Sequence, residues 1–311
     1  MSKWIRNILA IVILAFLLWY VSEHWQQLRA LLRLKPAHLL ILYTLCLMQM
    51  CGSAGVVRTL LGALKTKTSL WDMFLLQSAS VLLNYVPLKF GTLFRANYLK
   101  RYYGLTYARF ATFFLYITFL MTATAAAVGL AVLLTSYGLT KHENKILAGV
   151  FAITIISSLF LLFIPLPVPA GQGRLSTTLR NFLTGRSQIS KENKAIFIAV
   201  VLLGVNFLLT ALRIGIIYHS IGQDIKPWGY LILGALGFVV LFIGVTPGAL
   251  GIRELVLGSG AVVLGIPLEV GFFAAIIDRA VMLSFSLVVG GMCVGWLWHR
   301  SPADFKKSHT N

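Results

Sequence analysis

Long apolar runs separated by short polar segments recur along almost the whole chain. A membrane-spanning helix needs about 20 mostly apolar residues to cross roughly 30 Å of hydrocarbon, and the pattern predicts about eight crossings. A short helix at the membrane surface is expected over 25–34. The long expected spans are residues 5–20, 37–64, 110–137, 146–168, 195–221, 228–245 and 270–298, and the shorter apolar run 255–266 brings the number to about eight. The sequence therefore predicts an all-α fold, a polytopic helical membrane bundle.

Two regions interrupt this pattern. Residues 69–86 are apolar but short and stop at Pro87, which predicts a re-entrant segment that enters the membrane without crossing it. The basic stretch 88–109 carries too many charges for a lipid-exposed span and is expected to form an amphipathic surface segment. The second interruption lies at 246–251, before a short apolar run over 255–266.

The two interruptions share proline, glycine and arginine. The residues concerned are Pro87, Gly91 and Arg95 in the first, and Pro247, Gly248, Gly251 and Arg253 in the second. In transporters, Gly/Pro-interrupted segments at corresponding positions of two halves often mark a midplane binding site, where freed backbone groups and helix N-termini hold an anion. The alternative is that these residues merely end helices at the membrane surface.

Composition and charge narrow the class of protein. Hydrophobic residues make up 58% of the 311 positions and charged residues 12%, which excludes a water-soluble globular chain. Lys and Arg number 27 against 9 acidic residues, and they cluster between apolar runs, which favours anionic lipid headgroups over nucleic acid as partners. The chain is expected to be one integral membrane domain, with halves 1–168 and 195–299.

The distribution of basic residues also predicts the topology. The segment 169–194 is expected to be a cytoplasmic basic loop, and the tail 300–311 is expected to be cytoplasmic as well. Both termini would then lie in the cytoplasm of a bacterial cytoplasmic (inner) membrane. The basic residues Arg29, Arg33 and Lys35 would lie outside, against the same rule.

Several charged residues lie inside the apolar stretches. Each would cost at least about 2.5 kcal/mol if it faced lipid at the centre of a helix, so each should face the bundle interior, water or an interface. Asp278 and Arg279 point about 100° apart on a helix, and their expected partners are Arg253 and Glu254 on another segment. The expected substrate-binding residues are Arg95, Arg253, Glu254, Arg213, Asp278 and Arg279.

Two roles are open for these residues. Arginines can receive a lipid phosphate through bidentate hydrogen bonds, with acids orienting them, or they can form ion pairs that only hold helices together. The structural role is favoured for Asp278, and the binding role for Arg253. The sequence contains no metalloprotease spacing, phosphate loop or nucleophile elbow, so no enzyme activity, cofactor or metal site is predicted.

Residues 245–254, with the sequence Val-Thr-Pro-Gly-Ala-Leu-Gly-Ile-Arg-Glu, resemble the Pro-Gly-Gly-Leu-Gly-Val-Arg-Glu signature of the lysylphosphatidylglycerol synthase transmembrane-region family. Ala249 replaces the second glycine of that signature. Residues 84–104 are similar to the family's other interrupted region, with Thr92 where an acidic residue is usual. The resemblance covers nearly the whole chain and implies the flippase-like half of the bifunctional lysyl-lipid proteins, without their separate synthase domain.

The leading hypothesis is a lipid translocase for an anionic, aminoacylated or polyprenyl-linked lipid. The alternative is a non-transporting accessory subunit that binds a lipid-synthesis or glycosyltransferase enzyme through the basic loop 171–194, and a homo-oligomer is also open. A third hypothesis is an integral-membrane transferase, for which Asp72 and Glu254 are the candidate carboxylates. The sequence alone leaves open the lipid, the direction of movement and the energy coupling.

Overall fold

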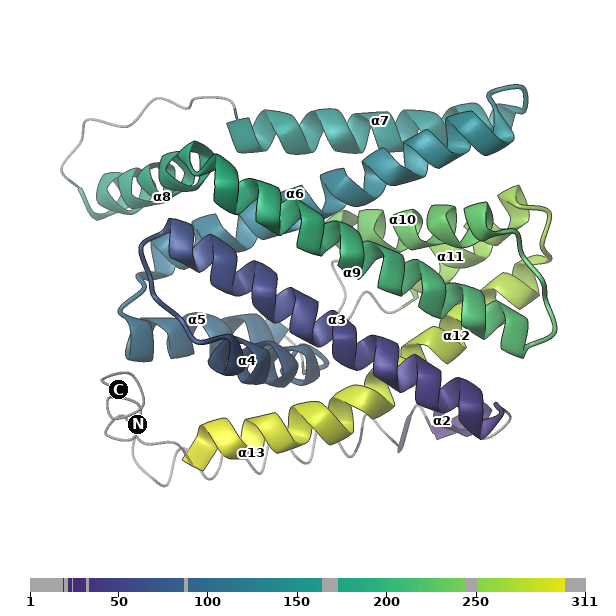
Figure 1. Ribbon diagram of the computed structural model, residues 1–311, viewed down its shortest axis with the longest axis horizontal. Helices are drawn as coiled ribbons and strands as arrows, with labels where there is room; N and C mark the ends of the chain where they lie inside the picture. The colour runs from purple at the N-terminus through teal and green to yellow at the C-terminus, as the bar shows by residue number, and fades with distance from the viewer. Residues whose placement is uncertain are drawn as a thin grey trace.

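A computed structural model describes residues 25–31, 34–86, 89–163, 173–243 and 251–299, together with Trp19, Ser22 and Glu23. Within these ranges every regular element is a helix (Figure 1). The chain enters the described region through the short helix α2 (Trp25–Ala30), where a short surface helix was expected. Apart from Trp19, the span predicted over 5–20 lies outside the described residues, as do Pro87, Pro247 and Gly248.

Five helices of the described region are long and apolar enough to cross a membrane. They are α3 (Pro36–Ala63), α6 (Tyr107–Val132) with its π-helical extension η3 (Leu133–Tyr137), α7 (His142–Phe163), α9 (Asn193–Ser220), and α12 (Leu268–Phe285) continued by η5 (Ser286–Gly290) and α13 (Gly291–His299). All five coincide with predicted spans. The prediction of a helical membrane bundle is therefore confirmed.

The helices α3 and α9 form an antiparallel pair along the bundle (Figure 1). A Cβ atom on Gly52 would lie 2.4 Å from the Asn206 side-chain oxygen, and one on Gly55 would lie 3.2 Å from Leu202. Small residues allow this close approach, as in many membrane helix pairs. The pair defines two ends of the bundle: the first face, with Ala63 and Asn193, and the second face, with Pro36 and Ser220.

The first hairpin consists of α4 (Leu70–Leu83) and α5 (Phe90–Tyr103), and it both begins and ends at the first face. A Cβ atom on Gly91 would lie 2.0 Å from the Ser80 carbonyl oxygen, so only glycine fits where α5 starts beside α4. The Asn84 side chain accepts a hydrogen bond from the Thr92 backbone N–H at 3.0 Å. This contact satisfies one of the free donors at the start of α5.

The prediction of a surface segment over 88–109 is wrong for α5. This helix packs against α4 and α6, and it buries Arg95 and Leu99, whereas Lys100 and Arg101 are exposed near its end. The charge count of the segment suggested a surface location because it did not distinguish the buried arginine from the basic residues at the first face.

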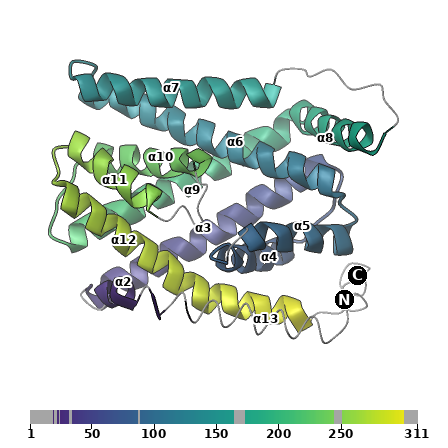
Figure 2. The ribbon, with the colours of Figure 1, turned by 180° about the vertical axis from the view of Figure 1, so that it is seen from behind.

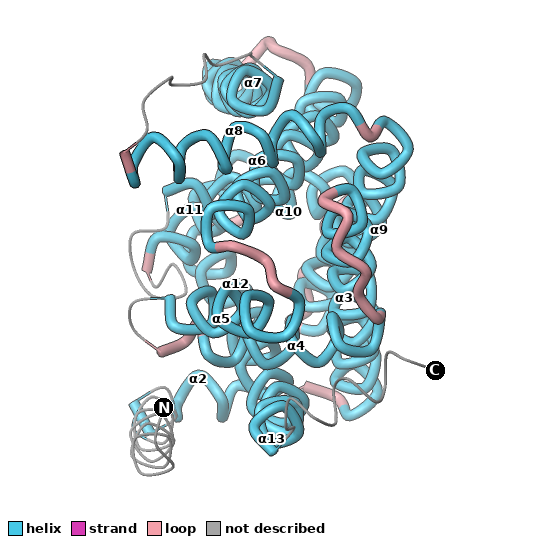
Figure 3. Tube along the Cα trace, turned by 90° about the vertical axis from the view of Figure 1, so that its left-hand side faces the viewer, coloured by secondary structure: helices cyan, strands magenta, loops and turns pink. Residues whose placement is uncertain are grey.

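The second hairpin consists of α10 (Pro227–Ile243) and α11 (Ile252–Val263), and it begins and ends at the second face. Its second helix packs closely on α12, since a Cβ atom on Gly271 would lie 2.5 Å from that of Ala261. The two hairpins thus enter the bundle from opposite ends, as Figure 2 also shows. Seen along the bundle, both lie next to the α3–α9 pair (Figure 3).

The segment predicted to be a basic loop over 169–194 contains a helix, α8 (Arg174–Lys191), at the first face. Leu183 and Ile189 are buried, and the Thr112 hydroxyl of α6 donates a hydrogen bond to the Phe182 carbonyl oxygen at 2.9 Å. The sequence analysis did not predict this helix within the connection, because the many polar residues concealed an apolar face that packs on α6.

Candidate functional site in a buried ion-pair network

The network begins where α11 starts. Gly251, directly before the helix, has a φ of +80°, a conformation that favours glycine. Its backbone N–H donates to Oε2 of Glu254 at 2.9 Å, so the Glu254 side chain caps the helix start. This turn places Arg253 and Glu254 at the inner end of the second hairpin, where they face α12.

Asp278 is the centre of the network. It lies ten residues into α12, which corresponds to about 15 Å from the second face at 1.5 Å per residue. Its Oδ1 accepts from Nε of Arg213 at 2.7 Å, and its Oδ2 accepts from Nη2 of Arg253 at 2.7 Å. The Asp278 side chain is 2% exposed, so two guanidinium groups surround a fully buried carboxylate. The predicted Arg253–Asp278 contact is confirmed.

A second ion pair joins α11 to α12. Nη1 of Arg279 donates to Oε1 of Glu254, and both side chains are buried. Because Asp278 and Arg279 point in different directions from α12, they reach different partners on α11, as predicted. Two ion pairs therefore fix the start of α11 to the middle of α12.

Sequence reasoning missed Gln49, which completes the network from α3. Its Oε1 accepts from Nη1 of Arg213, and its Nε2 donates to the Thr210 hydroxyl and to the Asn206 carbonyl oxygen. Gln49 lies halfway along α3, in the middle of an apolar run. A polar amide in that position is costly to bury without partners, which was the signal that could have identified it.

The charges of the network do not cancel. Three guanidinium groups, of Arg213, Arg253 and Arg279, form ion pairs with two carboxylates, of Asp278 and Glu254, so these five side chains together carry one net positive charge. Arg253 is the most accessible member, with a side chain 22% exposed, and its Nε is buried without a hydrogen bond. The arrangement can therefore accept an anion at Arg253.

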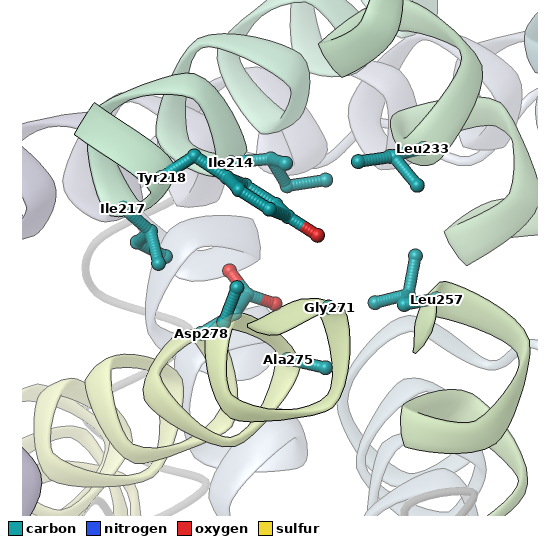
Figure 4. Close-up of a pocket in the computed structure, with 9 residues that line it drawn as sticks. Ile214, Ile217, Tyr218, Leu233, Leu257, Gly271, Ala275 and Asp278 are labelled. Atoms are coloured by element: carbon teal, nitrogen blue, oxygen red, sulfur yellow. The ribbon is translucent and has the colours of Figure 1, made fainter. Parts of the chain in front are cut away.

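A small cavity lies beside the network, between the second hairpin and the helices α9 and α12 (Figure 4). Its lining is mostly apolar, with Asp278 and the ring of Tyr218 on it, and the Tyr218 hydroxyl points into it. The cavity has room for about one water molecule, because the centre of such a molecule can move within only about 10 Å³. A lipid headgroup would require the hairpin to move.

The predicted site residues fall into two groups. The first group forms the network and consists of Arg213, Arg253, Glu254, Asp278 and Arg279. The second group is Arg95 alone, which lies in the first hairpin and forms no ion pair with the described members of the network. Gly91 and Gly251 are the two predicted glycines that the structure describes. Gly91 lies in the first turn of α5, and Gly251 directly precedes α11. In the described ranges, no group of three His, Cys, Asp or Glu side chains is arranged to hold a metal ion.

Comparison with known proteins identifies the family. The family model of the lysylphosphatidylglycerol synthase TM region matches residues 7–290. Neither the curated proteins nor the solved structures contain a significant match to this chain. The match extends over both hairpins and all members of the ion-pair network. The chain therefore belongs to the family of the lysylphosphatidylglycerol synthase TM region, a family of membrane proteins related to lipid metabolism.

Proposed function

We propose that this protein is a translocase that moves a lipid with an anionic, aminoacylated or polyprenyl-linked headgroup between the leaflets of a bacterial cytoplasmic membrane. The observation that carries the proposal is the excess guanidinium charge of the network, together with the free Nε of Arg253. A lipid phosphodiester supplies one negative charge and two oxygens, which suits an arginine with unused donors. Family membership supports a lipid-related role.

The opposed hairpins support movement between leaflets. The α4–α5 hairpin begins at the first face and α10–α11 at the second, so each gives one leaflet a route towards the interior of the bundle. Discontinuous helices of this kind form the midplane sites of many secondary transporters.

We place the first face in the cytoplasm, with both termini on that side. The basic residues of the described segments there outnumber those at the second face, in agreement with the positive-inside rule. Those at the first face are Lys65, Lys67, Lys100, Arg101, Arg109, Arg180, Lys191 and Lys194, and those at the second are Arg29, Lys35, Lys141, Lys145 and Lys226.

Leaflet exchange in proteoliposomes tests the proposal. The purified full chain is reconstituted with a fluorescent phosphatidylglycerol, and the fraction bleached by an external reductant reports exchange. We expect the Arg253→Ala variant to lose exchange and Arg253→Lys to retain only part of it, because lysine keeps the charge but not the bidentate geometry. Arg101→Ala, at an exposed position near the end of α5, is the matched control. Unchanged exchange in Arg253→Ala would remove this residue from the site.

The helix α8 favours one alternative, a non-transporting accessory subunit. Its outer face is exposed at Arg180, Asn181, Thr184 and Ser187, which would give a lipid-synthesis or glycosyltransferase enzyme a rigid docking surface. Capture of such an enzyme that is lost when Arg180 and Lys191 are neutralised, without leaflet exchange by the purified protein, would support it. The transferase hypothesis has less support, because Tyr103 donates to Asp72 at 2.8 Å and Arg279 binds Glu254.

A further inference from the structure

Arg95 is a buried arginine of the first hairpin that the network does not use. It is 6% exposed, on the face of α5 that also buries Gly91 and Leu99. Among the residues that the structure describes, Arg95 has no ion pair, and its Nε has no hydrogen bond. A cation in this position lacks both a counter-charge and full solvation.

The other buried arginines of the described ranges are all satisfied. Arg213 binds Asp278, Arg279 binds Glu254, and Arg186 donates from Nε to the Leu162 carbonyl oxygen at 3.0 Å. Burying an unpaired charge is strongly unfavourable, and proteins normally avoid it by pairing the charge or replacing it with an apolar residue. The charge of Arg95 is neither paired nor replaced by an apolar side chain. Its environment therefore suits an anion that arrives from outside the chain.

The position of Arg95 relates it to one leaflet. It lies eight residues before Tyr103, the end of α5 at the first face, which corresponds to about 12 Å along the helix. Arg253 is instead held by α12 at the inner end of the hairpin that enters from the second face. The two arginines therefore lie on separate hairpins that open to opposite leaflets.

We infer that Arg95 forms a second, independent binding site for a phosphate group, which serves the leaflet at the first face, while Arg253 serves the other. The inference rests on the proposed function and specifies its substrate path: the phosphodiester of a lipid is bound at one hairpin and then at the other. The guanidinium of Arg95 has a free Nε, and a phosphate oxygen pair can accept from Nε and one Nη together.

Native mass spectrometry of the purified full chain with dihexanoyl phosphatidylglycerol tests the inference. We expect two bound molecules for the unchanged protein, one for Arg95→Met, one for Arg253→Met and none for the double variant. Arg101→Met is the control and should bind two. Two molecules on Arg95→Met, or loss of both from either single variant, would overturn independent sites. Glycerol 1-phosphate and inorganic phosphate are the parallel probes, and occupancy of Arg95 by either would assign the site to free phosphate instead of a lipid.

Thermal unfolding separates this role from a structural one. Arg95→Met should raise the Tm, because it removes an unpaired buried cation and keeps the side chain's length. A structural arginine would give a lower Tm instead, and that result would also overturn the inference. The proposed function can fail separately: two binding events without leaflet exchange would reject the translocase but leave the second site intact.

Discussion

Nη2 of Arg253 lies 2.7 Å from Oδ2 of Asp278, although the two residues are 25 positions apart in the sequence, on α11 and α12. The contact gives the second hairpin a fixed position against α12. Because Arg213 binds the other oxygen of the same carboxylate, Asp278 links three helices at one point. An anion that competes for Arg253 would leave Asp278 bound to Arg213, and the Glu254–Arg279 pair would still hold the start of α11 against α12.

Replacement of Asp278 by asparagine should destabilise the protein strongly. The substitution removes the charge that two buried guanidinium groups share, and breaking a buried ion pair in this way costs about 3–5 kcal/mol. Thermal or SDS-induced unfolding in detergent measures the loss.

The matched variant for this prediction removes both charges of the Arg213–Asp278 pair, which is more deeply buried than Arg253–Asp278. Asp278→Leu combined with Arg213→Met should cost less than Asp278→Asn alone, since no uncompensated charge remains at Arg213. Equal losses in the two proteins would mean that charge burial does not control the stability of this site.

A methyl group at Gly91 should disrupt the first hairpin. Its Cβ would lie 2.0 Å from the Ser80 carbonyl oxygen, so α4 and α5 must separate, and the Gly91→Ala variant should lose about 2 kcal/mol or more of stability. Gly149→Ala in α7 is the control, because no atom lies within 4 Å of the added Cβ and alanine favours the helix by up to about 1 kcal/mol. If both variants had the same stability, the close approach at Gly91 would be refuted.

The sequence predicted the five long helices and the two interruptions because their signals are local, but it did not predict that α5 pairs with α4 or that α11 pairs with α10. About 20 apolar residues require a helix in lipid whatever the rest of the chain does, and a proline or glycine in such a run interrupts it. The Arg253–Asp278 and Glu254–Arg279 contacts were also predictable, since neighbouring residues on a helix must find partners on different sides.

What the sequence could not provide depends on packing between distant segments. Gln49 belongs to the network only because α3 and α9 run antiparallel, which brings it next to Arg213. Likewise, nothing local distinguishes Arg95, which is buried, from Arg101, which is exposed six residues later on the same helix. The helix α8 was missed because its apolar face is defined by contact with α6.

Gln49→Leu should weaken the network without changing its charge. The substitution removes the oxygen that accepts from Nη1 of Arg213 and leaves this buried donor with the weaker sulfur acceptors of Cys46 and Met282, at a cost of about 1–3 kcal/mol. Gln77→Leu in α4 is a matched control, because the Gln77 Oε1 is buried without a hydrogen bond, and its removal should be neutral or stabilising. Unfolding of both variants in detergent provides the comparison. A larger loss for Gln77→Leu would contradict the assigned role of Gln49.

The Glu254–Arg279 pair should show a favourable coupling energy in a double-mutant cycle. Glu254→Gln and Arg279→Gln each leave a buried charge without its partner. The sum of the two single losses in unfolding free energy should therefore exceed the loss in the double variant by about 1–3 kcal/mol, which is the coupling energy. Unfolding free energies of the four proteins complete the cycle. Simple additivity would show that the two side chains do not interact in the membrane.

The orientation of the two faces can be tested with single cysteines, because Lys65 and Asp224 are exposed at opposite ends of the bundle. In a chain whose three native cysteines are replaced by alanine, a membrane-impermeant maleimide added to intact cells should label Asp224→Cys at once. It should label Lys65→Cys only after the membrane is opened, since basic residues concentrate at the first face. The reverse pattern would invert the leaflets that the two hairpins serve. Labelling of both positions from the same side would be more serious, because the hairpins could then no longer enter from opposite faces.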